Sequence, residues 1–297
     1  MSGRPRIAIT VGDPAGIGPE IAVKAAGHPD VSSLCEPVLY GPSGEEDLAA
    51  FTRGRVSAEA GQAAYRAVLR AVSDAVDGRI DAIATAPINK ASFAAAGLPW
   101  KGHTDLLAHL TGARRGVMMF YAEALKVVLA TVHIPLASVA AALTRPLLED
   151  TIRVTAEALP RFGLERPRIA VAGLNPHAGE GGLIGSEDEA VIAPAVAACA
   201  AEGITVTGPF PADTIFLRAT RGEFDVVVAC YHDQGLIPVK MAAFGRAVNV
   251  TLGLPIVRTS VDHGTAFDIA GTGVADPSSM IEAVKLAARL APARRET

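Results

Sequence analysis

Short apolar runs rich in β-branched residues alternate along the chain with longer, alanine-rich amphipathic stretches. From the N-terminus the pattern predicts a strand IAITV, a helix from about Pro19, a strand VLY ending near Tyr40, a helix from about Glu59 to Val76 and a strand AIATA. This spacing is typical of βαβ units. It favours a mostly parallel sheet covered by helices.

The alternation changes between Val117 and Thr131 and then resumes. There MMFYA and KVVLA are separated only by Glu-Ala-Leu, which predicts an antiparallel hairpin, as in an arm or an inserted sheet. Beyond it we expect a helix from about Pro146 to Phe162, a strand RIAVAG, a helix from Glu187 to Ala201, strands at ITVTG, VVVAC, VNVTL and PIVRT, and a last helix from Pro277 to about Ala291.

Composition narrows the class of protein. The 297 residues exceed the usual single domain, and the net charge of -4 has no block of like charges, so neither a nucleic-acid nor an anionic-membrane surface is indicated. Cys35, Cys199 and Cys230 form no CxxC motif, which suits packing cysteines in a reducing cytosol. No signal segment is expected, and the most apolar stretch, Ala190 to Ala201, is too short to cross a bilayer. We expect a cytoplasmic protein whose partners are small molecules.

Three histidines each follow a predicted strand within a few residues. They are His133 after VVLA, His177 in NPHAGEGG after RIAVAG, and His232 in YHDQG after VVVAC. In an open α/β sheet the carboxyl ends of the strands face the ligand crevice, so these imidazoles can converge on one divalent ion. Taken singly, each histidine also suits a simple hydrogen-bonding role in its loop. Their repetition favours a catalytic metal site.

Glycine-rich loops allow two interpretations. The loop from Gly12 to Glu20 follows a strand and opens a helix, but position 21 is Ile21, so the loop lacks the third glycine of a dinucleotide-binding fingerprint. It is either a tight turn or a cradle for phosphate. The same alternatives apply to Gly179, Gly181 and Gly182.

The motifs GDPAGIGPE, TAPINK, GHTD, NPHAGEGG, PADT, YHDQG and RTSVDHGTA follow one another along nearly the whole chain. Together they resemble the 4-hydroxythreonine-4-phosphate dehydrogenase family of vitamin B6 biosynthesis, and more distantly the isocitrate and isopropylmalate dehydrogenases. The resemblance implies an α/β fold of two α/β/α domains, with a mostly parallel mixed sheet and a cleft between them. It implies an outer, cofactor-side domain of residues 1–105 plus 255–297. Residues 106–254 would form an inner domain with the metal histidines and the dimer contact.

The resemblance also implies roles for particular residues. A divalent metal would be held by His133, His177 and His232; three imidazoles suit zinc, with cobalt, manganese or magnesium also accepted. Substrate would contact His103, Thr104, Lys240, Asn249 and Arg258, and NAD or NADP would contact His263, Gly264 and Asp268. Taken alone, Lys240 and Arg258 would be ordinary solvated charges. The family's active site lies at a homodimer interface, with metal ligands from both subunits.

The implied reaction is metal-assisted oxidation of a secondary alcohol by hydride transfer to nicotinamide, giving a β-keto acid that loses CO2 and leaves 3-amino-2-oxopropyl phosphate. Asp213 or Lys90 would accept the proton. Asp213 is equally well read as the N-cap of a helix beginning near Thr214.

Two features bear on the choice of substrate. The chain looks shorter than typical members between about Tyr40 and Glu59, and it has TAPINK where some B6 enzymes have TGPVHK. Paralogues that oxidise 4-phospho-D-threonate or phospho-D-erythronate by the same mechanism remain an alternative, and dihydrodiol dehydrogenases rank third. From other classes, a metal-binding regulatory protein would not need the complete residue set, and a zinc hydrolase would not need the DHGTAFDIAG loop.

Overall fold

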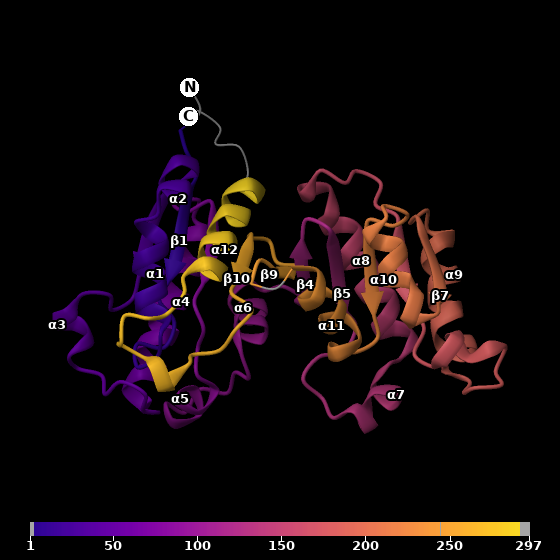
Figure 1. Cartoon of the computed structure of the whole chain (residues 1–297), viewed down its shortest axis with the longest axis horizontal. Coiled ribbons are helices and arrows are strands. Elements are labelled where there is room, and N and C mark those ends of the chain that lie inside the picture. The colour runs from indigo at the N-terminus through magenta and orange to yellow at the C-terminus, as the bar shows by residue number, and fades with distance from the viewer. Residues whose placement is uncertain (1–2, 244, 292–297) are drawn as a thin grey trace. The chain divides into compact units, whose positions relative to one another are not determined.

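The computed structural model describes residues 3–243 and 245–291. The chain divides into two compact units. Unit 1 combines the described residues up to Gly116 with those from Val248 onward, and unit 2 is Val117–Ala247. Figure 1 labels the elements of both units. The chain therefore leaves unit 1 once, builds unit 2, and returns.

The unit boundaries differ from the expected positions near residues 105 and 255 for local reasons. Helix α6 (His103–Thr111) packs on helix α4 (Ala58–Val76), so it stays with unit 1. Strand β9 (Val248–Leu252) pairs antiparallel with β10 (Arg258–Ser260), so it also belongs to unit 1.

The sheet of unit 1 has the strand order β2-β1-β3-β10-β9. Strand β1 (Arg6–Thr10) lies parallel to β2 (Glu36–Tyr40) and to β3 (Ala82–Thr85), and β3 lies parallel to β10. All four residues of β3 are buried, as expected for a central strand covered on both faces.

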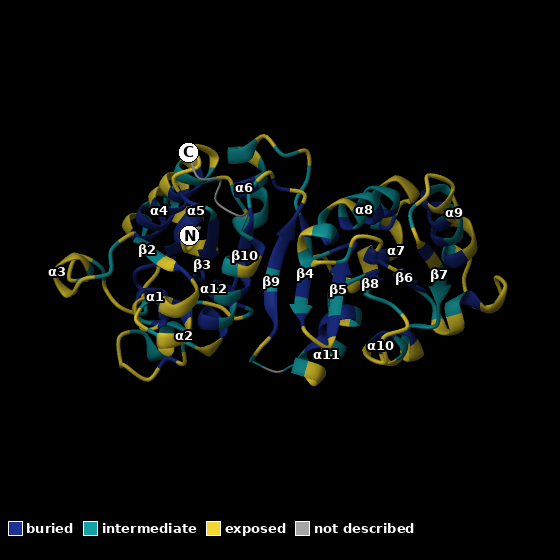
Figure 2. Cartoon of the chain, turned by 90° about the horizontal axis from the view of Figure 1, so that it is seen from above, coloured by how far each residue is buried: buried dark blue, intermediate teal, exposed yellow. Residues whose placement is uncertain are grey.

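Helices cover both faces of this sheet (Figure 2). One layer contains α1 (Gly18–Ala26), α2 (Pro29–Leu34) and α12 (Ser278–Leu290), and the other contains α4, α5 (Lys90–Ala95) and α6. The short helix α3 (Glu45–Leu48) lies in the connection from β2 to α4. Helix α4 begins where the Ser57 side chain accepts a hydrogen bond from Ala60 N–H at 3.1 Å.

The strands of unit 2 follow the order β4-β5-β8-β6-β7. Its strands are β4 (Val117–Ala122), β5 (Leu125–Leu129), β8 (Val226–Ala229), β6 (Ile169–Ala172) and β7 (Val206–Phe210). The β4–β5 pair is antiparallel, which confirms the predicted hairpin, and the other pairs are parallel.

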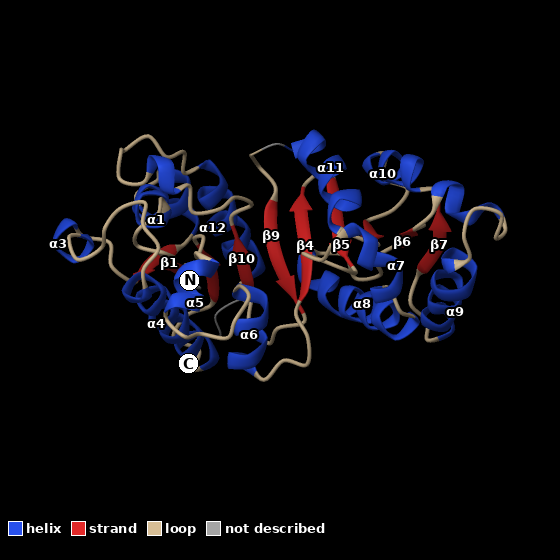
Figure 3. Ribbon diagram, turned by 90° about the horizontal axis from the view of Figure 1, so that it is seen from below, coloured by secondary structure: helices blue, strands red, loops and turns tan. Residues whose placement is uncertain are grey.

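The helices of unit 2 also form two layers (Figure 3). Helices α8 (Arg145–Ala158) and α9 (Ala193–Ala201) cover one face, and α10 (Ala212–Thr220) and α11 (His232–Ala243) cover the other. Unit 2 also has the short helix α7 (Val139–Ala142) and a π turn at Asp188–Ile192. Its 3-10 segments are Leu136–Ser138, Leu159–Phe162 and Pro176–Glu180, and unit 1 has one at Phe267–Ile269.

The predicted mixed α/β class with mostly parallel strands is confirmed. The sequence pattern missed helices α2, α3, α5, α6, α7 and α11. No helix within the described ranges is long and apolar enough to span a membrane. The three cysteines are buried and free, as expected for packing residues.

A substitution on α4 tests how closely the helical layer of unit 1 is packed. A Cβ at Gly61 would lie 2.1 Å from the Ser92 carbonyl oxygen. Alanine is the better helix former, but the clash should outweigh this gain, so Gly61→Ala should destabilise the protein by roughly 1–3 kcal/mol. Gly27→Ala is the matched control, because the nearest atom to its Cβ, Val23 O, is 3.6 Å away. Urea unfolding should show the control unchanged or more stable by roughly 0.4–1 kcal/mol. Equal stability of the two variants would contradict the predicted clash.

Candidate active site

Four polar side chains form a row across one face of the unit 1 sheet. Thr10 is paired with Thr85, Thr85 with Ser260, and Ser260 with Asn249, so the row crosses β1, β3, β10 and β9. Directly paired residues of neighbouring strands project to the same face. The hydroxyls of Thr85 and Ser260 are hydrogen-bonded at 3.0 Å. The row lies at the carboxyl ends of the parallel strands, where open α/β sheets bind ligands.

Arg258 places a positive charge beside this row. Its side chain is buried, with the residue 2% exposed, and it donates from Nε and Nη2 to Thr85 Oγ1 at 3.2 and 2.7 Å and from Nη1 to Thr251 Oγ1 at 3.0 Å. No described carboxylate pairs with it, and burial lowers the pKa of Arg258 to about 9. A buried guanidinium bonded only to neutral hydroxyls lacks a counter-charge. The alternative interpretation of Arg258 from the sequence, an ordinary solvated surface charge, is therefore wrong.

His103 and Thr104 are the first two residues of α6. Asp105 fixes the turn before the helix by accepting a hydrogen bond from Gly102 N–H at 2.9 Å. His103 retains some exposed surface, but its Nε2 is buried without a hydrogen-bond partner, as is Asn249 Oδ1. Burial, and then the charge of Arg258, lower the pKa of His103 well below its usual value. A neutral imidazole and an amide therefore offer unsatisfied polar atoms in the same unit as an uncompensated cation.

The first loop holds a buried acid. Asp13 is fully buried; its Oδ1 accepts a hydrogen bond from Ala15 N–H at 2.9 Å, and its Oδ2 has no partner. Burial raises the pKa of Asp13, although the nearby Ser92 hydroxyl and Ala15 N–H favour its ionised form. Ser92 Oγ makes no hydrogen bond of ordinary geometry, so its opposing effect is weak.

The glycines of this loop are required by close packing. A Cβ on Gly12 would lie 2.2 Å from Pro87 O, and one on Gly18 would lie 2.1 Å from Val11 O. Of the two interpretations, these contacts favour the tight turn. In the neighbouring loop, Lys90 is the exposed first residue of α5, and its helix is capped by Asn89, which accepts from Ser92 N–H at 3.0 Å.

The loop carrying His263, Gly264 and Asp268 lies on the surface of unit 1. All three residues are exposed, and His263 Nδ1 is 3.0 Å from Gly264 O. The loop is attached to the N-terminal elements through its backbone. Lys24 Nζ donates to the carbonyls of Gly273 and Ala275 at 2.8 and 2.9 Å.

Two further contacts hold the same loop. Glu20 accepts a hydrogen bond from Ala275 N–H at 3.0 Å, and Arg53 Nη1 donates to Gly271 O at 3.0 Å. Gly271 has a φ of +72°, and a Cβ there would lie 2.3 Å from Arg53 Cδ. The segment before α4 and the first helix therefore position the C-terminal loop.

In unit 2, His133 and His232 lie side by side, with ring centroids 5.5 Å apart. Two imidazoles bound tetrahedrally to one ion at about 2.0–2.1 Å hold their centroids about 5 Å apart, so this pair suits two ligands of a single metal. His232 Nδ1 is 2.7 Å from Asp233 Oδ1. Such a carboxylate orients the ring and leaves Nε2 directed to a metal.

His177 lies in a left-handed stretch of backbone. His177, Ala178 and Glu180 have φ values of 54°, 55° and 43°, a region that non-glycine residues rarely adopt. Buried Asp188 holds the chain before this turn by accepting from the N–H groups of Leu174 and Asn175 at 2.8 and 3.0 Å. The exposed His177 side chain is thus carried on an ordered but strained loop.

Within the described residues of one chain, no three His, Cys, Asp or Glu side chains lie close enough together to hold a metal. The three predicted histidines are therefore not assembled into one site by a single chain. The pair of His133 and His232 is present, and His177 is presented separately.

Two other predicted residues lie on the helices of unit 2. Lys240 is half-buried in the last turn of α11. Asp213 is exposed in the first turn of α10, which begins at Ala212 with Pro211 at the N-cap position. The N-cap interpretation of Asp213 is therefore wrong, because the helix starts earlier than expected.

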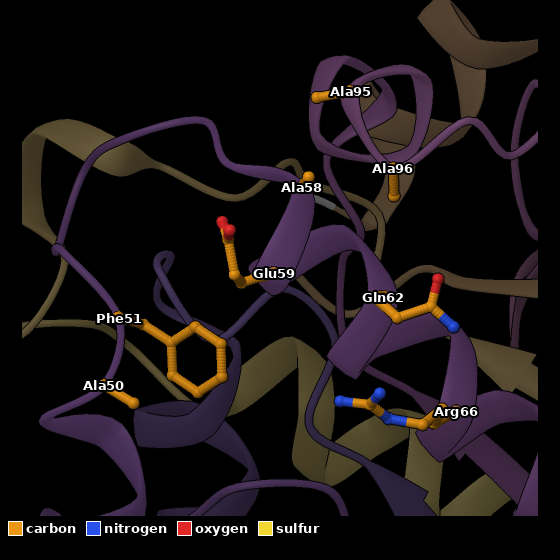
Figure 4. Close-up of a pocket in the computed structure, with 8 residues that line it drawn as sticks. All are labelled: Ala50, Phe51, Ala58, Glu59, Gln62, Arg66, Ala95 and Ala96. Atoms are coloured by element: carbon orange, nitrogen blue, oxygen red, sulfur yellow. The ribbon is translucent and has the colours of Figure 1, made fainter.

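An open pocket of about 500 Å³ lies elsewhere in unit 1, between the start of α4 and the end of α5 (Figure 4). The pocket is lined by Phe51, Glu59, Gln62 and Arg66, together with the alanines Ala50, Ala58, Ala95 and Ala96. None of the predicted site residues contributes to this pocket.

A family model described as "Pyridoxal phosphate biosynthetic protein PdxA" matches residues 23–287. The chain belongs to this family. The resemblance identified from the sequence motifs is thereby confirmed. Among similar proteins, the 4-hydroxythreonine-4-phosphate dehydrogenase of Desulforapulum autotrophicum is 46% identical, covering 96% of this chain and 95% of that protein. The D-threonate 4-phosphate dehydrogenase of Cupriavidus necator is 44% identical, covering 98% of each.

Solved structures of PdxA relatives have the same fold. A 4-hydroxythreonine-4-phosphate dehydrogenase from Klebsiella pneumoniae superposes with a TM-score of 0.88 at 42% identity, over 97% of this chain and 98% of that one. A terephthalate 1,2-cis-dihydrodiol dehydrogenase from Burkholderia xenovorans gives 0.69 at 33% identity, over 96% and 98%. The PdxA fold thus also serves a dehydrogenase with an unphosphorylated substrate.

The buried acid of the first loop predicts a pH dependence of stability. In the unfolded chain the pKa of Asp13 is about 3.8, and in the folded protein it is higher, so folding strengthens proton binding. The stability of the protein therefore falls as the pH rises from about 3.8 through the folded pKa. Asp13→Asn mimics the protonated acid. Its free energy of unfolding relative to the unchanged protein should therefore rise with pH over this window and then level off.

Asp276→Asn is the control of opposite sign, because the hydrogen bonds from Ser278 lower the pKa of Asp276. Its relative stability should fall with rising pH. Urea unfolding of the three proteins between about pH 2 and pH 8 measures both trends, with the Asp276→Asn trend below about pH 4, and a pH-independent difference for Asp13→Asn would rule out a raised pKa.

Proposed function

We propose that this protein oxidises 4-phosphohydroxy-L-threonine with NAD or NADP, and that the resulting 3-keto acid loses CO2 to give 3-amino-2-oxopropyl phosphate. Membership of the PdxA family and the names of its relatives support this activity. The observation that carries it is the buried, uncompensated guanidinium of Arg258. A phosphate or carboxylate supplies the charge that this guanidinium lacks.

Unit 1 contains the proposed anion-binding residues. Arg258 donates charge-assisted hydrogen bonds, the start of α6 presents Thr104, and His103 and Asn249 hold orphaned polar atoms that a phosphorylated hydroxy acid can satisfy. Because His103 stays neutral, it offers one ring nitrogen as donor and the other as acceptor. Lys240, in the last turn of α11, is a further cation that would contact substrate.

His133, His177 and His232 would hold a divalent metal, with zinc favoured by the imidazole donors over magnesium. When bound, the ion would supply Lewis acidity that lowers the pKa of the substrate hydroxyl and stabilises negative charge during oxidation and decarboxylation. The paired rings of His133 and His232 support this assignment, and the contact of Asp233 with Nδ1 would leave the Nε2 of His232 as the metal-binding nitrogen.

The chain's own side chains must also accept a proton and position the cofactor. Asp213, through a carboxylate oxygen, or Lys90, through Nζ in its neutral form, would take the hydroxyl proton as the hydride passes to nicotinamide. Both side chains are exposed and so accessible to a ligand. His263, Gly264 and Asp268 would contact the cofactor from the loop that Lys24, Glu20 and Arg53 hold.

We propose a homodimer in which the metal ligands come from both subunits. The absence of a three-ligand group within the described part of one chain is consistent with this arrangement. Large apolar side chains are exposed on the segments that follow the three histidines. Leu136, Leu183 and Met241 are 69%, 84% and 83% exposed, as expected for residues that a second copy covers.

Oxidation of D-threonate 4-phosphate or phospho-D-erythronate by the same chemistry is the alternative. Relatives named D-threonate 4-phosphate dehydrogenase are 43–44% identical to this chain, close to the values for the other substrate class. Both substrate classes present a phosphate, a carboxylate and a secondary hydroxyl, so the same residues serve either.

Initial rates of NADH or NADPH formation, followed at 340 nm with the metal-loaded protein and each phosphorylated substrate, test this proposal. We expect turnover of 4-phosphohydroxy-L-threonine to exceed that of 4-phospho-D-threonate, and to be abolished by a chelator or by His232→Ala. Preference for phosphothreonate would select the alternative. Inactivity on both substrates, with cofactor binding intact, would refute the assigned substrate class.

Arg258→Met separates substrate binding from stability. The lowered pKa shows that the folded state disfavours the guanidinium charge, so at neutral pH the neutral variant should be as stable as the unchanged protein or more stable, by roughly 1–4 kcal/mol. Substrate binding should weaken by about 100-fold or more, because a desolvated charge-assisted contact is lost. Arg246→Met, at an exposed arginine, is the control. Unchanged substrate affinity in Arg258→Met would contradict an anion site at Arg258.

A further inference from the structure

The three histidine-bearing loops of unit 2 follow neighbouring strands. Strand β8 lies between β5 and β6. His133 follows β5, His232 follows β8 and His177 follows β6. The loops are joined by hydrogen bonds around Cys230, the residue that directly follows β8. Cys230 is buried, and its thiol donates to Ala172 O at 3.3 Å.

Thr131 connects the His133 loop to this residue. Its N–H and its hydroxyl donate to the carbonyl oxygen of Cys230 at 3.2 and 2.7 Å. Thr131 and Cys230 each stand two residues before a histidine, so the hydrogen bonds tie the starts of these two loops at corresponding positions. The connection between the His133 and His232 loops therefore uses mainly backbone atoms.

Gln234 connects the His177 and His232 loops through its side chain alone. Its Oε1 accepts from Cys230 N–H at 2.6 Å, and its Nε2 donates to Gly173 O at 2.7 Å. Gly173 in turn lies against the strained His177 turn, because a Cβ at Gly173 would be 2.9 Å from Ala178 Cα. The glutamine amide therefore spans two loops and uses both of its ends to do so.

We infer that Gln234 is a positioning residue, whose amide fixes the His177 and His232 loops within each chain and so determines how tightly the histidines on these loops bind a divalent ion. The inference rests on the proposed metal site. Only an amide satisfies both contacts, because one end must accept from an N–H and the other must donate to a carbonyl. The half-buried side chain lies in the first turn of α11, two residues beyond His232.

Two substitutions separate the roles of the two ends. Gln234→Met preserves the length of the side chain and removes both hydrogen bonds. Gln234→Glu keeps an acceptor for Cys230 N–H but places a carboxylate oxygen against Gly173 O, where a donor is needed. Thr155→Val is the control: it removes a buried hydrogen bond, Thr155 Oγ1 to Thr151 O at 2.7 Å, on α8 of the same unit.

The decisive measurement is the affinity of the full-length metal-free protein for Co²⁺, by calorimetry and by the visible absorption of the bound ion, together with the unfolding temperature without metal. Both Gln234 variants should bind Co²⁺ about 10- to 100-fold more weakly, as expected for outer-shell groups that orient ligands. Thr155→Val should lower the unfolding temperature without changing Co²⁺ affinity. The Co²⁺ spectrum of Gln234→Met should also shift, because the ligand geometry changes.

His232→Ala distinguishes failure of this inference from failure of the proposed function. If the unchanged protein binds Co²⁺, His232→Ala does not, and both folded Gln234 variants bind normally, the positioning role is refuted and the metal site stands. If His232→Ala binds as well as the unchanged protein, the metal site itself is wrong and the inference fails with it. A loss of affinity in Thr155→Val equal to that in Gln234→Met would reduce the role of Gln234 to general stability.

Discussion

The candidate site depends on a positive charge that the protein buries without neutralising. Removing a guanidinium from water costs several kcal/mol unless other groups replace its hydration, and here Thr85 and Thr251 replace it only in part. The protein therefore keeps a cation in a state that an anion would stabilise. Because an anion binding there favours the folded state, substrate binding and the stability of unit 1 are thermodynamically linked. The neutral His103 adds polar contact without a second buried charge.

Much of the fold could be predicted because its long elements have strong periodicity. The helix expected from Glu59 to Val76 spans Ala58–Val76, and the last helix spans Ser278–Leu290. Helices α6 and α11 were missed for a physical reason. Each begins at a histidine that the sequence marks as a candidate site residue, and α11 contains Gly235 and Pro238, so its packing against the sheet, rather than local propensity, stabilises it. The local sequence features that indicated these two helices were weak: each has one acidic residue in its first turn, Asp105 or Asp233.

The sequence motifs named candidate site residues but not the residues that position them. Arg258 could be named from its motif, yet its burial depends on Thr85, which is 173 positions away along the chain. The His133–His232 pair follows from the order of β5 and β8, whereas Gln234 and Asp188 act through contacts that no local pattern encodes. Within the described residues the three histidines do not form one group, although each follows a strand as the sequence predicted, because the position of His177 depends on the left-handed turn of its loop.

The position of β10 determines the order in which the chain can complete its structure during synthesis. This strand lies between β3 and β9, yet it consists of residues near the C-terminus. Unit 2 is continuous, so all of its strands leave the ribosome before Arg258 does. Unit 1 must wait with β3 exposed along one edge, and such unpaired edges favour association between incomplete chains. The same late strand carries the buried cation Arg258, so the nascent chain acquires this candidate site residue only when its last strand is added.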